Sequence, residues 1–452
     1  APARMKHGWK MNHGLEGRAT FRRQRAVRHD SGRRCQAVRC RLSACGSAGA
    51  SPSRLTTTDL TEMTTDSEDC RILKSLRETP ELFALLDAES GRELGVQKRL
   101  RSEFDADLVR AAMTVRDLQS RGEIKFTRAA DMWFDPKGLE QATSQTVAEH
   151  KAKRFAGQDH VSDWCCGIGA DAIALATAGC NVEAVDLLEA QCLRTEWNAE
   201  VYGVADRVTT RPVDVTTIVD RTGLLHLDPD RRNELGRRIT RVEDCSPGLP
   251  FLQQVIRRFA GGAIKLSPAS NFAGKFLDAE IELVSLHGEC REATVWFGEL
   301  AAEESFRATA LPSGETLAAD PLSAWTNVGE PGEFLFDPDP GIVRAGLVDV
   351  LAEKLDLRRL DDAEEYLTGD APVSSPFLQT FRVLDNLANN PKQYRRAVRA
   401  HSFGQAEVKC RHIPIHAEDV RRKLPLDGSK PGVLIFARQA GKARAFVCER
   451  VG

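Results

Sequence analysis

The chain has 452 residues, enough for two or three domains with buried cores. Its twelve cysteines are scattered without a Cys-x-x-Cys pair, which argues against a zinc site and against a secreted disulfide framework. No apolar run approaches the roughly 18 residues that a membrane-spanning helix needs, so we expect a cytoplasmic protein with no membrane or metal site.

Charge is distributed unevenly along the chain. Residues 1–54 contain 13 Lys and Arg residues against Glu16 and Asp30, a net charge of +11, whereas the whole chain has a formal charge of −2. This basic stretch is rich in Gly, Ser and Ala and has little apolar periodicity, so we expect residues 1–62 to be disordered. It could be a nucleic-acid arm or an organelle-targeting peptide; the plainer alternative is an unstructured extension.

Residues 63–138 are expected to form a helical domain. Apolar residues recur at three- and four-residue steps from Ile72 to Leu118, which is the pattern of amphipathic helices. Such an apolar face usually packs into a core, so we expect no chemistry in this domain.

Residues 139–325 are predicted to be an α/β domain, a doubly wound parallel sheet. Short apolar runs alternate there with helical segments. Because the C-terminal ends of parallel strands share one edge, a ligand should bind at that edge. The predicted parallel strands are 161–165, 181–185, 208–212, 224–227 and 263–266, and three later segments, 281–286, 294–300 and 305–311, are expected to be antiparallel strands.

The first predicted strand runs into a glycine turn of the kind that binds nucleotide cofactors. In Val161-Ser-Asp-Trp-Cys-Cys-Gly-Ile-Gly-Ala-Asp171 an apolar run ends in Asp163 and a Gly-x-Gly turn, so backbone N–H groups can face a ligand. Sites for NAD, FAD and S-adenosylmethionine all use such turns, so the loop alone leaves the cofactor open.

Acidic residues at later strand ends narrow the choice of cofactor. Asp186 ends the second strand, where a carboxylate would bind the ribose hydroxyls of either NAD or S-adenosylmethionine. Asp214 follows the third strand and could hold an adenine amino group. Asp228-Pro-Asp-Arg-Arg232 follows the fourth strand, where a dehydrogenase has no reason to carry it. Each acid alone could be a solvated strand end, but together they favour S-adenosylmethionine.

These motifs resemble those of class I S-adenosylmethionine-dependent methyltransferases, and more narrowly those of the bacterial family that ends in a THUMP-like domain. The resemblance covers most of residues 70–452. It implies S-adenosylmethionine as the cofactor. Besides the loop and the acids above, it rests on Leu139-Glu-Gln-Ala-Thr-Ser144, Glu196-Trp-Asn-Ala199, Gly236-Arg-Arg238, Ser246-Pro247, Ile264-Lys-Leu-Ser-Pro268, Phe336-Asp-Pro-Asp-Pro340, Arg344-Ala-Gly346, Tyr366-Leu-Thr368, Ser375-Pro-Phe377 and Phe381.

The cofactor site is expected at the loop and the strand ends. Cys165 stands where the broad class has its first loop glycine, so its side chain would narrow the methionine pocket. The residues expected to bind the cofactor are Asp163, Cys165, Gly167, Gly169, Asp186, Asp214 and Asp228.

The segment after the fourth strand is expected to carry the reaction. Asp228 would accept a hydrogen bond from the acceptor nitrogen or hydroxyl, and Pro229 would fix the loop. Arg231 and Arg232 would contact the substrate and its phosphates or, alternatively, pair with nearby acids. Lys265 either faces the site as a substrate-binding residue or is a strand-end lysine that reaches solvent. Asp230 replaces the second proline of an Asn/Asp-Pro-Pro-aromatic loop, and no aromatic residue follows it.

The C-terminal residues 375–452 are predicted to be a basic THUMP-like α+β module, joined to the sheet by a helical connection, residues 326–374. Residues 391–452 contain 14 Lys and Arg residues against five acids, a net charge of +9. Strands are expected at 406–410, 433–438 and 443–448, with a helix at 417–423. Arg411, Arg421 and Arg422 are expected to hold RNA phosphates; the alternative is a solvated basic face that packs on the acidic domain.

The sequence therefore predicts a methyltransferase of tRNA or rRNA, acting on a base or a ribose. The alternatives are a catalytically silent RNA-binding protein, a nicotinamide-dependent oxidoreductase and a methyltransferase of proteins or small molecules. The sequence makes no prediction of the oligomeric state.

Overall fold

The computed structural model describes residues 9–13, 19–23, 57–88, 94–219, 223–230 and 240–451. The chain divides into two compact units, residues 1–55 and 56–452. In the first unit, strands β1 (Trp9–His13) and β2 (Ala19–Arg23) form an antiparallel pair. This pair lies within the segment expected to be disordered, so the structure differs from that prediction there. The other residues up to 56 lie outside the described part.

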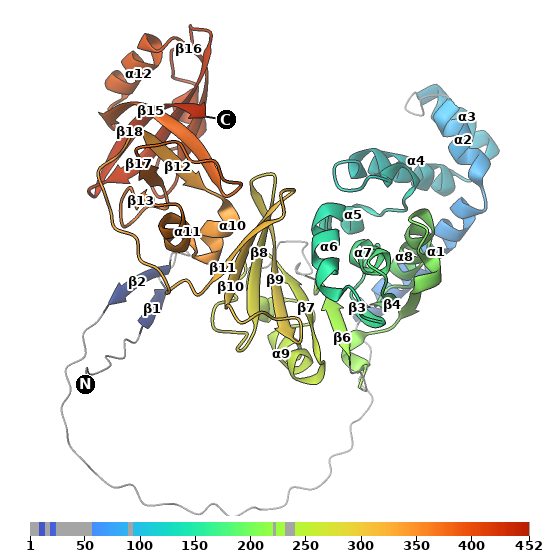
Figure 1. The fold of residues 1–452 in the computed structure, drawn as a ribbon. Coiled ribbons are helices and arrows are strands. Elements are labelled where there is room, and N and C mark those ends of the chain that lie inside the picture. The colour runs from blue at the N-terminus through green and yellow to red at the C-terminus, as the bar shows by residue number, and fades with distance from the viewer. Residues whose placement is uncertain are drawn as a thin grey trace, which may run out of the picture. The chain divides into compact units, whose positions relative to one another are not determined.

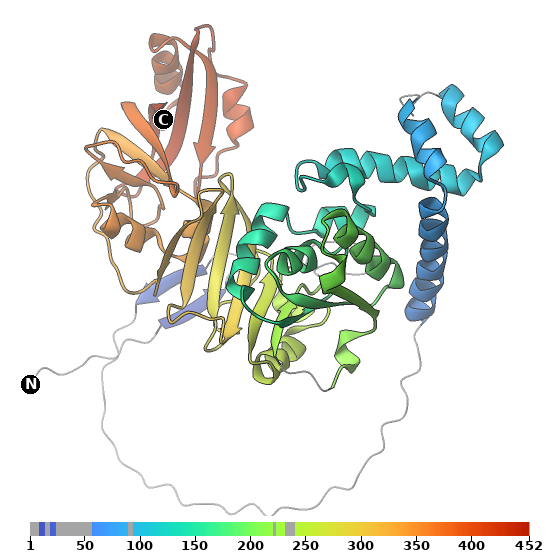
Figure 2. The same ribbon diagram turned by 45° about the vertical axis from the view of Figure 1, so that its right-hand side comes forward.

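Helices open the second unit, as the periodicity predicted, and the first begins at Thr57. They are α1 (Thr57–Arg77), α2 (Pro80–Ala88), α3 (Leu94–Glu103) and α4 (Ala106–Gly122). Figure 2 shows α1 leading to the other three. The Asp105 carboxylate starts α4 by accepting hydrogen bonds from the N–H groups of Asp107 and Leu108. None of the described helices is long and apolar enough to cross a bilayer.

A nine-stranded sheet follows, with the order β11-β10-β8-β9-β7-β6-β3-β4-β5 (Figure 1). Strands β3 to β7 are mutually parallel, and β9 lies antiparallel between β7 and β8. The doubly wound parallel sheet predicted from the sequence is confirmed. The strands are β3 (His160–Trp164), β4 (Asn181–Asp186), β5 (Val208–Pro212), β6 (Leu224–Leu227), β7 (Gly261–Leu266), β8 (Glu280–Leu286), β9 (Glu289–Gly298), β10 (Phe306–Leu311) and β11 (Glu315–Ala319).

One strand pairing differs in part from the prediction. β10 was expected to be antiparallel; it is antiparallel to β11, but it pairs with β8 in parallel. The reason is that β9 ends beside the start of β8, where the N–H of Ile281 donates to the carbonyl of Ser305. A strand that begins at that point runs in the same direction as β8.

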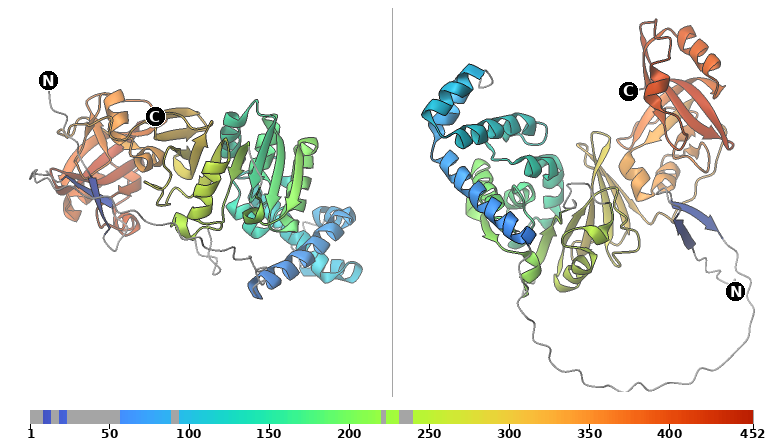
Figure 3. Two further views of the ribbon diagram at one scale, coloured as in Figure 1. Left: turned by 90° about the horizontal axis from the view of Figure 1, so that it is seen from below. Right: turned by 180° about the vertical axis from the view of Figure 1, so that it is seen from behind.

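Helices cover both faces of this sheet (Figures 1 and 3). α6 (Gln145–Ala152), α7 (Ala170–Thr177) and α8 (Glu189–Val201) contribute to the core on one face, and α9 (Leu249–Arg258) contributes to the core on the other. Strand β6 serves both cores, because Leu224 belongs to the first and Leu225 to the second. A short helix, α5 (Pro136–Gln141), precedes α6.

The C-terminal region forms a seven-stranded sheet of order β13-β14-β12-β15-β18-β17-β16. Its strands are β12 (Phe334–Pro338), β13 (Arg358–Arg359), β14 (Leu367–Gly369), β15 (Leu378–Ala388), β16 (Phe403–Cys410), β17 (Lys430–Gln439) and β18 (Lys442–Val451), and its helices are α10 (Pro340–Ala345), α11 (Val348–Lys354), α12 (Pro391–Ala400) and α13 (Ala417–Arg421). The predicted strands and helix of the basic module are all present; β15 and α12 were not predicted.

The region before this module contains strands as well as the expected helices. Residues 326–374 were expected to be a helical connection, and they do contain α10 and α11. They also contain β12, β13 and β14, which join the C-terminal sheet because Leu335 pairs with Phe381 and both side chains are fully buried. The sheet to which the predicted module contributes therefore also includes strands from residues 326–374.

Side chains near α10 join the two sheets. The Asp339 carboxylate accepts hydrogen bonds from the N–H of Gly341, which starts α10, and from the Ser285 hydroxyl on β8 at 2.5 Å. The Arg344 guanidinium donates to the carbonyls of Pro268 and Ser270, in the loop that follows β7. The loop after β7 is thus held by the region that begins the C-terminal sheet.

A fully buried carboxylate, Glu282 on β8, should make the fold sensitive to acid. Burial alone would raise its pKa, but His150 at 2.8 Å, Arg154 and the Thr309 hydroxyl lower it to about 2. A carboxyl whose folded-state pKa is depressed stabilises the fold above its unfolded pKa, and this contribution disappears as the pH falls through the folded value.

We therefore expect the free energy of unfolding to fall by on the order of 3 kcal/mol through Glu282 between pH 4.5 and pH 2. Urea titrations at several pH values measure this. Glu282→Gln should be less stable at pH 7 and should lose less stability over the same interval. Equal losses in both proteins would rule out this assignment.

Candidate active site at the C-terminal edge of the sheet

The loop that follows β3 turns through three residues with positive φ. These are Cys165 at +61°, Gly167 at +56° and Gly169 at +85°. A Cβ added to Gly169 would lie 2.9 Å from the Thr195 side chain on α8, so only glycine allows this packing. A Cβ added to Gly167 would have no heavy atom within 4 Å. The backbone at Gly167 therefore borders open space.

Asp186, at the end of β4, is tied to this loop. Its Oδ2 accepts a hydrogen bond from the N–H of Gly167 at 2.9 Å, and its Oδ1 accepts one from the N–H of Leu188 at 3.1 Å. Burial raises the pKa of the Asp186 carboxyl, and these backbone donors offset part of the rise. A carboxylate has about four acceptor positions, so Asp186 can still accept hydrogen bonds from a ligand.

Three further residues lie near this edge. Asp214, predicted beside the third strand, is exposed and accepts hydrogen bonds from the N–H and hydroxyl of Thr216. Burial raises the pKa of the Cys165 thiol well above its ordinary value, which makes it a poor nucleophile. Leu187, which follows Asp186 directly and is 61 % exposed, was not predicted as a site residue. The pattern that could have indicated it is an apolar residue next to the acid at the end of a strand.

Asp163 lies beneath the loop and contacts His226 on β6. The two side chains are buried, with Asp163 Oδ1 2.7 Å from His226 Nδ1. His226 Nε2 lies 3.2 Å from the Lys151 ammonium. An ammonium can only donate, so Nε2 accepts and the ring proton on Nδ1 is directed at Asp163. Among the described residues, the second oxygen of Asp163 has no hydrogen-bond partner.

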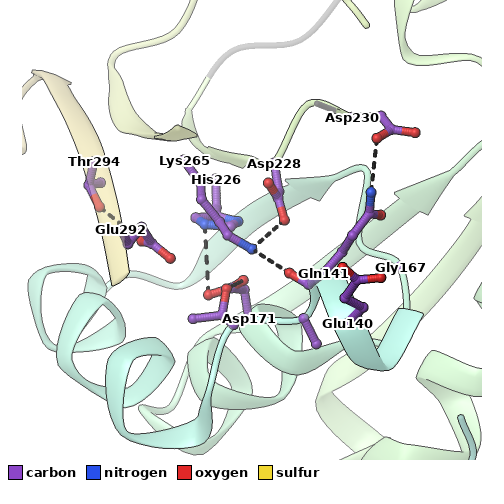
Figure 4. A network of polar contacts seen from close by, with 12 residues as sticks. Glu140, Gln141, Gly167, Asp171, His226, Asp228, Asp230, Lys265, Glu292 and Thr294 are labelled. Atoms are coloured by element: carbon purple, nitrogen blue, oxygen red, sulfur yellow. Dashed lines mark hydrogen bonds and ion pairs between the residues drawn. The ribbon is translucent and has the colours of Figure 1, made fainter. Parts of the chain in front are cut away.

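The Lys151 ammonium is the centre of this buried cluster (Figure 4 shows its partners). Its Nζ lies 2.9 Å from Asp171 Oδ1 and 2.8 Å from Glu292 Oε1. Burial would lower the pKa of Lys151, but the two carboxylates outweigh it and raise the pKa. For Asp171, burial acts in the opposite sense to the Lys151 charge, and the charge prevails, so its pKa is lowered. The Lys151–Asp171 pair therefore remains ionised.

A second, more exposed cluster lies on the segment after β6 (Figure 4). Asp228 Oδ2 lies 2.5 Å from the ammonium of Lys265 on β7, which also donates to the carbonyl of Gln141 at 3.2 Å. Asp230 accepts hydrogen bonds from Gln141 Nε2 at 3.0 Å and from Lys137 Nζ at 2.8 Å. Helix α5 is therefore bound to Asp230 directly and to Asp228 through Lys265.

Not all predicted substrate residues lie at this edge. Lys265 is buried and paired with Asp228 rather than reaching solvent. Arg231 and Arg232 lie outside the described residues. Arg411 donates to Asp337 Oδ1 at 2.5 Å within the C-terminal module. In the same module Arg421 pairs with Glu418 at 2.9 Å, and Arg422 pairs with Asp419.

Comparison with known proteins connects this geometry with a family. Residues 158–230 match the family model described as RNA cap guanine-N2 methyltransferase, and residues 378–450 match that described as THUMP domain-like. Two proteins of Mycobacterium tuberculosis, from strains CDC 1551 and H37Rv, are 32 % identical over 337 residues, 72 % of this chain and 92 % of theirs. Both are described as uncharacterized S-adenosylmethionine-dependent methyltransferases. The chain belongs to the S-adenosylmethionine-dependent methyltransferases.

The crystal structure of a putative methyltransferase from Porphyromonas gingivalis W83 has the same fold. Its TM-score is 0.67 at 18 % identity, and the match covers 83 % of this chain and 99 % of that one. The predicted family, with its class I sheet and C-terminal THUMP-like domain, is confirmed. The enzyme is a methyltransferase with S-adenosylmethionine as its cofactor, and the nicotinamide-dependent alternative is overturned.

The described residues of this methyltransferase fit that cofactor. The open space at Gly167 gives a ligand access to the loop backbone. Asp186 retains acceptor positions beside it, as a ribose with two hydroxyls requires. The partnerless oxygen of Asp163 gives the loop a further buried acceptor.

The Gly167→Ala variant should fold but bind S-adenosylhomocysteine at least tenfold more weakly, because its methyl group would occupy the space at the loop. Gly157→Ala is the matched control: Gly157 has a φ of +85°, also with no heavy atom near an added Cβ, but it lies outside the loop. Each variant should lose about 1–2 kcal/mol of stability to the positive φ. Calorimetric titration and thermal denaturation measure the two effects; equal affinities in both variants would contradict the expectation.

Proposed function

We propose that this methyltransferase acts on RNA, transferring a methyl group to a nitrogen or hydroxyl of a tRNA or rRNA base or ribose. The observation that carries the proposal is the position of the Asp228 carboxylate. It lies at the same edge of the sheet as the glycine loop, its side chain is 21 % exposed, and it forms an ion pair with Lys265.

The cofactor-binding residues are assigned from their positions. The loop backbone at Gly167 and Gly169 faces the cofactor, Asp186 accepts the ribose hydroxyls, and Asp214 accepts the adenine amino group. Leu187 supplies an apolar surface for the adenine ring. Asp163 and Cys165 border the methionine end of the pocket, where Asp163 is held in position by His226.

Asp228 is the residue that acts on the acceptor. The cofactor supplies a methyl group on a sulfonium, so the protein contributes mainly orientation and a group that takes a hydrogen bond from the acceptor. Lys265 occupies Asp228 Oδ2 and so leaves Oδ1 for the acceptor N–H or O–H. Pro229 restricts the backbone between Asp228 and Asp230. Asp230 is bound by α5 directly, and Asp228 is linked to α5 through Lys265. Catalytic and phosphate-binding roles for Arg231 and Arg232 remain predictions.

Charge and domain composition support an RNA substrate. Residues 391–452 carry a net charge of +9, although the whole chain has a net charge of −2. A directed basic region of this size suits phosphate binding. The similarity of residues 158–230 to a family described as RNA cap guanine-N2 methyltransferase supports the same substrate class.

Asp228→Asn should lower kcat on the RNA substrate by about 10²–10⁴-fold, because the variant loses the charge that takes the acceptor's proton. Its affinity for S-adenosylhomocysteine should change little. Asp159→Asn is the control, since Asp159 is exposed just before β3, at the opposite end of the strand. Transfer of labelled methyl groups into RNA from cells lacking the gene measures kcat. Unchanged kcat in Asp228→Asn would remove its assigned role.

Cells lacking the gene should lose one methylated nucleoside from tRNA or rRNA. Mass spectrometry of total nucleosides detects the loss, which the wild-type gene should restore and the Asp228→Asn gene should not. If no RNA nucleoside changes while the purified protein still binds S-adenosylhomocysteine, the substrate is a protein or a small molecule and the RNA assignment fails.

A further inference from the structure

Helix α12 presents an uninterrupted row of cations on its outer face. Lys392, Arg395, Arg396 and Arg399 are exposed, and the helix contains no acidic residue. Their spacing of three and four residues places them on one side of a helix. We call these four residues the α12 stripe.

The opposite side of α12 is fixed to the C-terminal sheet. Tyr394 and Val398 are buried in a core with Phe403, Leu434 and Phe436. The Tyr394 ring packs edge-on against Phe436 with ring centroids 5.5 Å apart. The Asn390 side chain starts the helix by accepting a hydrogen bond from the N–H of Lys392. The stripe therefore lies on a helix whose position is fixed by packing against the sheet.

Other cations of the same module have carboxylate partners, some in largely buried pairs and some in exposed ones. Lys409 and Arg411 both pair with Asp337, which is 8 % exposed. Arg421, Arg422 and Arg450 pair with the carboxylates of Glu418, Asp419 and Glu407, respectively. The arginines singled out from the sequence as phosphate ligands thus already have anionic partners.

The stripe lacks such partners. Within the described part of the chain, Lys392, Arg395 and Arg396 form no ion pair or side-chain hydrogen bond. Arg399 lies 3.7 Å from Asp427, and both side chains are more than two-thirds exposed, so this pair contributes little. Like charges held one helical turn apart repel each other, so an external anion would be favourable there.

We propose that the α12 stripe binds successive phosphates of the RNA substrate. This rests on the proposed function, and it moves the phosphate contacts of the module from Arg411, Arg421 and Arg422 to α12. The residues of each i, i+4 pair lie about 6 Å apart along the helix axis, so neighbouring phosphates can be bound together. Guanidinium groups suit this task because they bind phosphate through two parallel hydrogen bonds.

The burial of the apolar side of α12 favours an RNA over an anionic membrane as the partner of the stripe. A helix that lies on a membrane buries its apolar face among the lipids. In α12 that face is already buried in the module through Tyr394 and Val398, so only charge is available to a partner.

The test replaces Lys392, Arg395 and Arg396 together by Gln. The matched control replaces Lys423, Lys430 and Lys442 by Gln; these lysines are exposed in the same module and form no ion pair among the described residues. Both variants lose three positive charges, so they change the long-range field of the module by the same net charge. The probe is total tRNA and rRNA from cells lacking the gene, titrated at several salt concentrations.

The stripe variant should bind RNA at least tenfold more weakly at 0.1 M salt. The plot of log affinity against log salt should be shallower by about 2, since each lost phosphate contact removes about 0.7–0.9 from the slope. KM for RNA should rise, while kcat and the affinity for S-adenosylhomocysteine stay unchanged. The control variant should resemble the wild type.

If the affinity for RNA falls equally in both variants, binding depends on the overall charge of the module rather than on the stripe, and the proposal is overturned. If the wild type methylates RNA but the stripe variant keeps its KM and salt slope, the stripe proposal fails and the proposed function stands. If the wild type neither binds nor methylates RNA, both fail. Stripe-dependent binding to phosphatidylserine vesicles, without stripe-dependent RNA binding, would replace RNA by a membrane surface.

Discussion

The buried ammonium of Lys151 is the contact on which the active-site edge depends. It forms ion pairs with Asp171 on α7 and Glu292 on β9, and it lies within hydrogen-bond distance of His226 on β6. Through His226 it also reaches Asp163 on β3. One side chain on α6 thus joins three strands and the helix that begins at the glycine loop. Removing one partner of such a buried pair typically costs about 3–5 kcal/mol, because the remaining charge is left uncompensated.

The two lysines near this edge have different surroundings and different roles. Lys151 lies below the loop, satisfies buried carboxylates and is not available to any ligand. Lys265 lies on β7, the strand beside β6, and its partner Asp228 is partly exposed. The first ion pair lies beneath the glycine loop, and the second fixes one oxygen of a partly exposed carboxylate. The separation lets the fold keep its buried charges paired while one carboxylate remains available at the surface.

Local patterns revealed most of the sheet and of the cofactor edge. The apolar runs of β3 to β7 and the acids that follow them are neighbours in sequence, so Asp186, Asp214 and Asp228 could be placed from the sequence alone. Partners distant in sequence could not be found in this way: Glu292 is 141 residues from Lys151, and Asp337 is 74 residues from Arg411. A count of basic residues measures charge but does not show which cations are already paired. Strand β12 was missed because it is short and its partners in the sheet, β14 and β15, are distant in sequence.

The contact between Arg344 and the loop after β7 makes the methyltransferase sheet and the C-terminal region of this chain depend on each other. The core below the methyltransferase sheet is shared, since Leu283 of β8 packs in the same cluster as Ile342 and Phe336 of the following region. Arg344 adds hydrogen bonds to two carbonyls that lie only a few residues beyond Lys265. The methyltransferase domain is therefore structurally dependent on the C-terminal region that follows it. Exchanging the C-terminal module for another would expose apolar side chains and release the loop that follows Lys265.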